Sequence, residues 1–130
     1  MRYDIIIHKG TDKIKLGLTS KEVQKVLGEL PYDTYEQFEM YENVRVEYDK
    51  SGRSITMEFF NTVQVYLDNV ALTNQRPELA MDLLKKYDSN LLVESPKIFQ
   101  SKILSIGCYA EDSNTIEAVL VGVKGYYDKF

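Results

Sequence analysis

The chain has few of the residues that metal and disulfide chemistry require. Its 130 residues include one cysteine, one histidine, three prolines and no tryptophan. A lone cysteine, Cys108, cannot form an intramolecular disulfide, and one cysteine with one histidine is too small a set for a closed zinc site. These absences exclude a disulfide framework and a structural zinc site, and we expect no metal and no other cofactor.

Motifs for catalysis and nucleotide binding are also missing. The single histidine, His8, lies at the end of a strand expected over residues 3–7, and no second histidine is available as the base for a serine or cysteine nucleophile. The seven glycines are scattered, so they form neither a phosphate-binding loop nor a dinucleotide fingerprint. We expect His8 to be a packed or solvated strand-end residue and the protein not to be an enzyme.

Long apolar runs and an excess of basic charge are absent too. The run Ile5–Ile7 is too short for the core of a signal peptide or for a membrane span. Sixteen basic and twenty acidic residues give a net charge of −4, which leaves no basic surface for a phosphate backbone. We therefore expect a cytoplasmic protein that binds neither nucleic acid nor membrane, with an acidity that suits a basic protein partner.

The chain does contain an internal repeat. Residues Leu16–Thr19, followed by an apolar periodic segment, recur as Val70–Thr73 with a similar segment, 54 residues later. A hairpin-like stretch at Tyr48–Ile55 recurs as Tyr109–Ile116, 61 residues later. This duplication predicts a single α+β domain over 1–130. It would consist of two tandem helix-plus-antiparallel-sheet units, about 1–68 and 69–130, with the helices packed on one face of the sheet.

Local signals mark two helices within these units. Thr19 and Glu22 have the spacing of a capping box, and Gly28 supplies the left-handed residue that ends the first helix. The second helix should carry Pro77 in its first turn, with Thr73 or the residue after it as N-cap. Both helices then show an apolar stripe that would pack on the sheet.

The first hairpin alternates apolar and polar residues. Pairing residues 44–48 with 55–59 places Arg45 opposite Glu58 and Glu47 opposite Thr56 on one face. The other face then holds every apolar side chain of the pair: Val44, Val46, Tyr48, Ile55, Met57 and Phe59. We expect residues 63–67 to add a third strand to this meander, residues 31–40 to form a loop, and residues 91–99 to bridge to the second hairpin. A last strand is possible at 125–130.

The second hairpin is apolar where the first is charged. The residues concerned are Leu104, Ile106, Val119 and Val121. A bulge near Gly107 or Gly122 would return them to the core, and a hairpin covered on both sides would also bury them. Alternatively, they form an exposed patch through which the protein associates with a second copy.

The polar face of the first unit is the candidate binding surface. We expect a contact face formed by Arg45, Glu47, Glu58, Gln64 and Tyr66, with Tyr32 and Tyr35 in the aromatic loop at its rim. The loop aromatics, which also include Phe38 and Tyr41, serve either as a lid on the core or as a recognition patch. Glu47 and Glu58 are also the best-placed carboxylates for acid and base chemistry, although Arg45 makes an ordinary ion pair the simpler interpretation.

One segment carries a family resemblance. The sequence IKLGLTSKEVQKVLGELP, residues 14–31, followed by a hairpin, resembles the opening of a helix-plus-sheet module. Such modules occur in small lipoproteins of outer-membrane assembly and, as a tandem pair, in the β-lactamase inhibitor proteins. These families are mostly non-enzymatic binders, so the resemblance implies a sheet face that is presented to another protein.

Two functional hypotheses follow from the sequence. The leading one is a non-catalytic bacterial protein-binding module, in its most concrete form a cytoplasmic immunity protein that neutralises a toxin, whose partner would be a basic toxin domain. The alternative is a small-molecule-binding or enzymatic domain with a pocket between the sheet and the aromatic loop, where Glu47 or Glu58 acts as acid or base.

Overall fold

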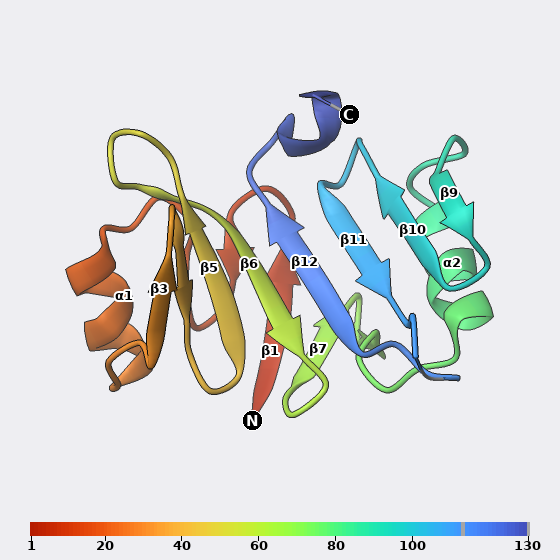
Figure 1. The fold of residues 1–130 in the computed structure, drawn as a ribbon. Helices are drawn as coiled ribbons and strands as arrows, with labels where there is room; N and C mark the ends of the chain where they lie inside the picture. Colours follow the sequence, from red (N-terminus) through yellow and green to blue (C-terminus); the bar gives the residue numbers. More distant parts are fainter. Residues whose placement is uncertain (113, 130) are drawn as a thin grey trace.

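The structure of the protein is a computed structural model that describes residues 1–112 and 114–129. Within these residues the chain forms an α+β fold with two sheets and two α-helices, α1 (Ser20–Leu27) and α2 (Pro77–Lys85), as Figure 1 shows. The α+β class expected from the sequence is confirmed. A short 3-10 helix at Tyr126–Lys129 follows the last strand.

The larger sheet has eight antiparallel strands in the order β3-β4-β5-β6-β12-β11-β10-β9. The strands of the first half are β3 (Asp33–Tyr35), β4 (Phe38–Met40), β5 (Val44–Tyr48) and β6 (Ser54–Phe60). Those of the second half are β9 (Leu92–Ser95), β10 (Ile98–Ser101), β11 (Ile106–Tyr109) and β12 (Ala118–Gly122). The two halves meet where β6 pairs with β12, and we call this junction the seam.

The smaller sheet has the order β2-β1-β7-β8. Its strands are β1 (Arg2–Ile6), β2 (Gly10–Thr11), β7 (Gln64–Leu67) and β8 (Val70–Ala71). β1 and β7 are parallel, whereas the outer pairs are antiparallel. In Figure 1 this sheet lies behind the centre of the larger one, with α1 at one side and α2 at the other, so both helices belong to the second layer.

The order of elements occurs twice along the chain. Two strands, a helix and four strands run from β1 to β6, and the same order runs from β7 to β12. In this order the second set begins at β7, a little before the expected boundary near residue 68. The common origin of the two sets stays a prediction.

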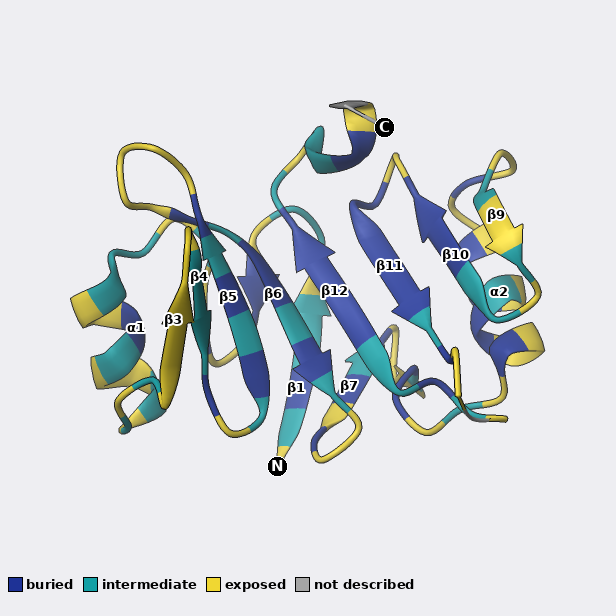
Figure 2. Ribbon diagram, viewed as in Figure 1, coloured by how far each residue is buried: buried dark blue, intermediate teal, exposed yellow. Residues whose placement is uncertain are grey.

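The core lies between the two layers. Tyr3 of β1 packs against Phe59 of β6 with ring centroids 4.6 Å apart, which brings the two sheets into contact. Alternate residues of β5 are buried, whereas β11 and β12 are buried along most of their length, as Figure 2 shows, and the helices add Val23, Leu83 and Leu84 to the core. Because one cluster includes residues from both halves, the halves share a single hydrophobic core.

The helix signals are confirmed for α1 and in part for α2. Thr19 and Glu22 form the predicted capping box, and Gly28 takes φ 70° at the C-cap. Pro77 is the first residue of α2, but the N-cap is Arg76 and has no capping side chain. Thr73 does not cap this helix because its hydroxyl bonds the backbone of the loop before β7 and of β7 itself.

The sequence predicted where strands occur better than it predicted which strands pair. Residues 63–67 do contain a strand, β7, but it pairs with β1 of the smaller sheet instead of extending the meander from β6. The segments expected to be a loop and a bridge instead form hairpins, β3–β4 and β9–β10, at the two edges of the larger sheet. These four strands have only three or four residues each, which is too short for alternation to identify a strand.

The expected register of the first hairpin is confirmed over most of its length. Arg45 lies opposite Glu58 and Glu47 opposite Thr56. The register shifts at the end, where Tyr48 pairs with Ser54 instead of Ile55. The expected last strand is wrong for residues 126–129, which are a 3-10 helix, and its residue 130 lies outside the described residues.

The exposed apolar patch proposed for the second hairpin is wrong. Leu104, Ile106, Val119 and Val121 are each at most 2% exposed. Ile106 pairs with Val121 without a register shift, so no bulge buries them. Gly107, Leu120 and Gly122 on the other face are buried as well, which confirms the alternative of a hairpin covered on both sides. Residues 61 positions apart in the two hairpins point to opposite faces of the sheet. The apolar residues of the second hairpin therefore point toward the second layer. They are therefore not available for self-association.

Replacing one of these residues tests their place in the core. Ile106→Ala should lower the free energy of unfolding by about 2–5 kcal/mol, because it leaves a cavity beside β12. The matched control is Ile103→Ala, since Ile103 is 59% exposed, and its cost should stay within about 0.5 kcal/mol. Urea unfolding followed by circular dichroism measures both. Equal costs for the two variants would place Ile106 outside the core.

Candidate functional site

One face of the larger sheet is turned away from the second layer, and we call it the outer face. A row of paired residues crosses all eight strands on this face. It runs in the order Asp33, Met40, Arg45, Glu58, Leu120, Gly107, Gln100 and Leu92. Neither helix covers the row, because both belong to the opposite layer (Figure 1). The row is built by both halves of the chain, but it is not open throughout, because Gly107, Leu120 and Gln100 are buried and the Tyr109 and Tyr127 hydroxyls lie over Gly107.

An ion pair lies at the centre of this row. Nη2 of Arg45 is 2.9 Å from Oε1 of Glu58, and the guanidinium also lies 4.7 Å from the centroid of the Phe38 ring. The side chain of Glu58 is only 16% exposed. Burial raises the pKa of Glu58, and the positive charge of Arg45 acts in the opposite direction. The sequence predicted this pair, and the structure confirms it.

Glu47 is held by hydroxyl groups on the same face. Its Oε1 accepts hydrogen bonds from the hydroxyl of Tyr126 at 2.8 Å and from the hydroxyl of Thr56 at 3.2 Å. Burial and the neighbouring Glu47 carboxylate both raise the pKa of Tyr126. Because Tyr126 lies in the C-terminal 3-10 helix, this contact ties the end of the chain to the outer face.

Two glycines make room for the C-terminal tyrosines. The hydroxyls of Tyr127 and Tyr109 are 2.9 Å apart, and a Cβ at Gly107 would lie 2.3 Å from the Tyr127 hydroxyl oxygen. A Cβ at Gly122 would lie 3.1 Å from Cβ of Tyr126. A side chain at Gly107 would displace the Tyr127 hydroxyl, and one at Gly122 would press against Tyr126, so both glycines allow the tyrosines to approach the sheet closely.

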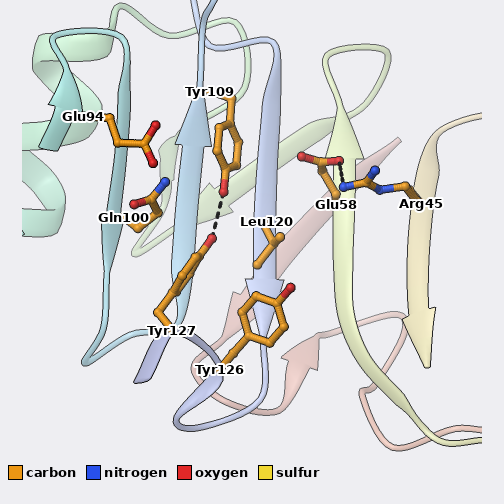
Figure 3. Close-up of a pocket in the computed structure, with 8 residues that line it drawn as sticks. All are labelled: Arg45, Glu58, Glu94, Gln100, Tyr109, Leu120, Tyr126 and Tyr127. Carbon is orange, nitrogen blue, oxygen red and sulfur yellow. Dashed lines mark hydrogen bonds and ion pairs between the residues drawn. The ribbon is translucent and has the colours of Figure 1, made fainter. Parts of the chain in front are cut away.

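The outer face contains a cavity of about 330 Å³ beneath these tyrosines. It spans the seam, because its walls come from β5 and β6 of the first half and from the strands of the second half (Figure 3). The residues that line it are Arg45, Glu58, Glu94, Gln100, Tyr109, Leu120, Tyr126 and Tyr127. Six of these eight were not among the predicted site residues. Glycines inside otherwise apolar strands, followed by a Tyr126-Tyr127 pair, were the available signal.

The structure divides the predicted contact face. Arg45, Glu47 and Glu58 share the outer face, but Gln64 and Tyr66 lie on β7 in the smaller sheet. Their neighbour Val65 is buried against the larger sheet, so both residues point to the opposite side of the molecule. The ring of Tyr66 lies under Arg2 instead, 3.8 Å from its guanidinium carbon.

The aromatic loop is divided as well. Tyr32 and Tyr35 are 70% and 67% exposed, and Tyr35 pairs with Phe38 at the edge of the outer face. Tyr41 is fully buried, and its hydroxyl donates to Glu39 on the inner side. Tyr41 therefore belongs to the core, Tyr35 extends the outer face, and a recognition role for the loop stays a prediction.

The residues examined for nucleophilic and metal chemistry lie apart from this cavity. His8 is in a turn after β1, with Nε2 2.6 Å from the carbonyl oxygen of Ile103. Cys108 is fully buried, and burial raises the pKa of its thiol to about 12, so it is a poor nucleophile. Among residues 1–112 and 114–129, no cluster of histidine, cysteine and acidic side chains could hold a metal, and no helix could cross a membrane.

The raised pKa of Glu58 makes stability depend on pH. Above the ordinary carboxyl value of 4.5, the unfolded chain loses this proton before the folded chain does. The contribution of Glu58 to folding is therefore largest at low pH and falls as the pH rises through the folded-state pKa. We expect the stability of wild type relative to Glu58→Gln to be greater at pH 4 than at pH 7, measured by urea unfolding.

Glu22→Gln serves as a control of opposite sign. The backbone of Thr19 donates a hydrogen bond to Glu22 and lowers its pKa, so its contribution is present at neutral pH and lost on acidification. The same pH trend for both variants would contradict the burial of Glu58.

Comparison with known proteins adds no constraint on this site. No protein-family model, curated protein or solved structure matches the chain significantly.

Proposed function

We propose that the protein is a non-catalytic protein-binding module that binds its partner through the outer face. The observation that carries this proposal is the row of paired residues that crosses all eight strands, with α1 and α2 in the opposite layer and only the tyrosines over Gly107 covering its middle. A broad sheet face is a rigid surface, so little conformational entropy is lost when it meets a partner.

The charge of the outer face favours a basic partner. Asp33, Glu47, Glu58 and Glu94 supply four carboxylates to this face, against the single guanidinium of Arg45. Opposite charge on a partner would speed encounter and disfavour acidic competitors. The chain as a whole also carries a net charge of −4.

Aromatic side chains on the same face favour a protein as the partner. Tyr35 is exposed at one edge, and Tyr109, Tyr126 and Tyr127 surround the cavity across the seam. Tyrosine is enriched at protein interfaces because it offers a large apolar ring and a hydroxyl at a low cost in conformational entropy.

The most concrete form of this function is an immunity protein that neutralises a bacterial toxin in the cytoplasm. Such a protein would cover a basic toxin domain with the outer face, without needing catalytic groups of its own. The resemblance of residues 14–31 to modules that present a sheet face to another protein supports the same mode of binding.

Site-specific photocrosslinking in native cells tests the proposal. We expect benzoylphenylalanine in place of Tyr35, on the outer face, to form a discrete crosslink to one protein. The same residue in place of Leu79 should not, because Leu79 is exposed on α2 in the other layer. Equal crosslinking from both positions, or none from Tyr35, would reject the outer face as the binding surface.

Charge reversal then tests the sign of the partner. Asp33→Lys should reduce the Tyr35-position crosslink about tenfold, because it places a positive charge on the outer face. Asp82→Lys is the matched control, since Asp82 is exposed on α2. If Asp33→Lys reduces the crosslink no more than Asp82→Lys does, the partner is not selected by acidic charge.

A second candidate function is a small-molecule or enzymatic site in the cavity. It is favoured by one observation: Glu58, whose pKa is raised by burial, lines a cavity with three tyrosines. The position differs from the expected one, because the aromatic loop does not line this cavity.

A thermal-shift screen of metabolites separates this candidate from protein binding. A true ligand should raise the melting temperature by about 5 °C at concentrations well above its dissociation constant, and Glu58→Gln should abolish the rise. If no compound behaves in this way, the small-molecule function is rejected and protein binding is the remaining function.

A further inference from the structure

We propose that the cavity on the outer face is a socket for one cationic side chain, a lysine ammonium or an arginine guanidinium, of the partner. This inference rests on the proposed function, because the side chain belongs to the protein that the outer face binds. It assigns the central anchor of that interface, which the function alone does not identify.

The polar atoms of the socket depend on one position of the cross-strand row that has no side chain. Gly107 lies between Leu120 and Gln100, so β11 places no side chain between these two residues. The hydroxyls of Tyr109 and Tyr127 occupy the space that a Cβ would need, 2.7 Å and 2.3 Å from its position. Polar atoms therefore lie directly over the backbone of a central strand.

The socket has room for a single long side chain. Its volume of about 330 Å³ is at the lower end of the range of about 300–1,000 Å³ for pockets that hold drug-sized ligands. It is open to solvent on the outer face, where a partner would approach, and Figure 3 shows its lining side chains on both sides of the seam.

The charges that line the socket favour a cation. Two carboxylates, Glu58 and Glu94, face one guanidinium, and Arg45 is already held by Glu58 and by the Phe38 ring. A second cation would balance the remaining negative charge, whereas an anion would meet two carboxylates. Glu58 is mostly buried, so its interaction with a cation would be only weakly screened.

The aromatic rings of the socket favour the same kind of group. Tyr126 and Tyr127 pack edge to face with centroids 5.2 Å apart, and Tyr109 completes the group. Aromatic faces attract ammonium and guanidinium ions, most strongly where water is excluded. Burial raises the pKa of all three tyrosines, so their hydroxyls stay neutral and can accept hydrogen bonds from a cation.

Titration of the full chain with small probes tests the socket. The probe is N-acetyl-arginine amide, its neutral isostere is N-acetyl-citrulline amide, and inorganic phosphate is the anion. We expect the arginine probe to bind with a dissociation constant of about 1–10 mM and to shift the backbone NMR signals of Gly107, Leu120 and Gln100. The citrulline probe should bind at least about tenfold more weakly, and phosphate should not bind there.

Variants connect this binding to the two carboxylates. Glu94→Gln should weaken the arginine probe about threefold and Glu58→Gln about tenfold, because Glu58 is the less exposed of the two. Glu42→Gln is the matched control, since Glu42 is exposed in the loop before β5. If Glu58→Gln disturbs the fold through Arg45, then Glu94→Gln, at an exposed edge strand, still tests the assignment.

Each result bears on one proposal or the other. Equal binding of the arginine and citrulline probes, preference for phosphate, or full binding by both Gln variants would overturn the socket. A Tyr35-position crosslink without arginine binding would leave the outer face as the interface and reject only the socket. Arginine binding without any crosslinked protein would reject the proposed function and, with it, the assignment of the cation to a protein.

Discussion

The pairing of β6 with β12 is the constraint on which the remaining structure depends. Five residue pairs, from Phe60 with Ala118 to Thr56 with Gly122, join two four-stranded halves into one sheet. On the inner side this pairing sets Phe59 beside Val119 and so builds one core from both halves. On the outer side it creates the junction that the cavity spans. Without it, neither half would possess a complete site.

The two sides of this sheet use the tyrosines of the chain differently. On the inner side, the hydroxyls of Tyr41 and Tyr48 donate to Glu39, which satisfies a carboxylate near the core. On the outer side, Tyr126 and Tyr127 cross the strands and bond to Glu47 and to another tyrosine hydroxyl. A chain with ten tyrosines and no tryptophan therefore has hydroxyl groups available for both purposes.

Local signals in the sequence predicted local structure, but they did not predict which distant segments pair with each other. The capping box at Thr19 and the opposition of Arg45 to Glu58 depend on residues close in the chain, and both are present. The parallel pairing of β1 with β7 depends on the packing of the whole chain, which alternation does not encode. The cavity forms where the C-terminal tyrosines contact strands that are far away in sequence. The glycines in β11 and β12 were therefore the only local signal for it.

The position of Cys108 has a consequence for how the folding of this sheet can be followed. Its thiol lies on β11 opposite Val119, one strand from the seam, and is the only one in the chain. Because it lies in the core between the two layers, a thiol-specific reagent reaches it only after the layers open. The rate of labelling under native conditions therefore reports the free energy of opening at the middle of the protein, from a single natural residue and without an engineered probe.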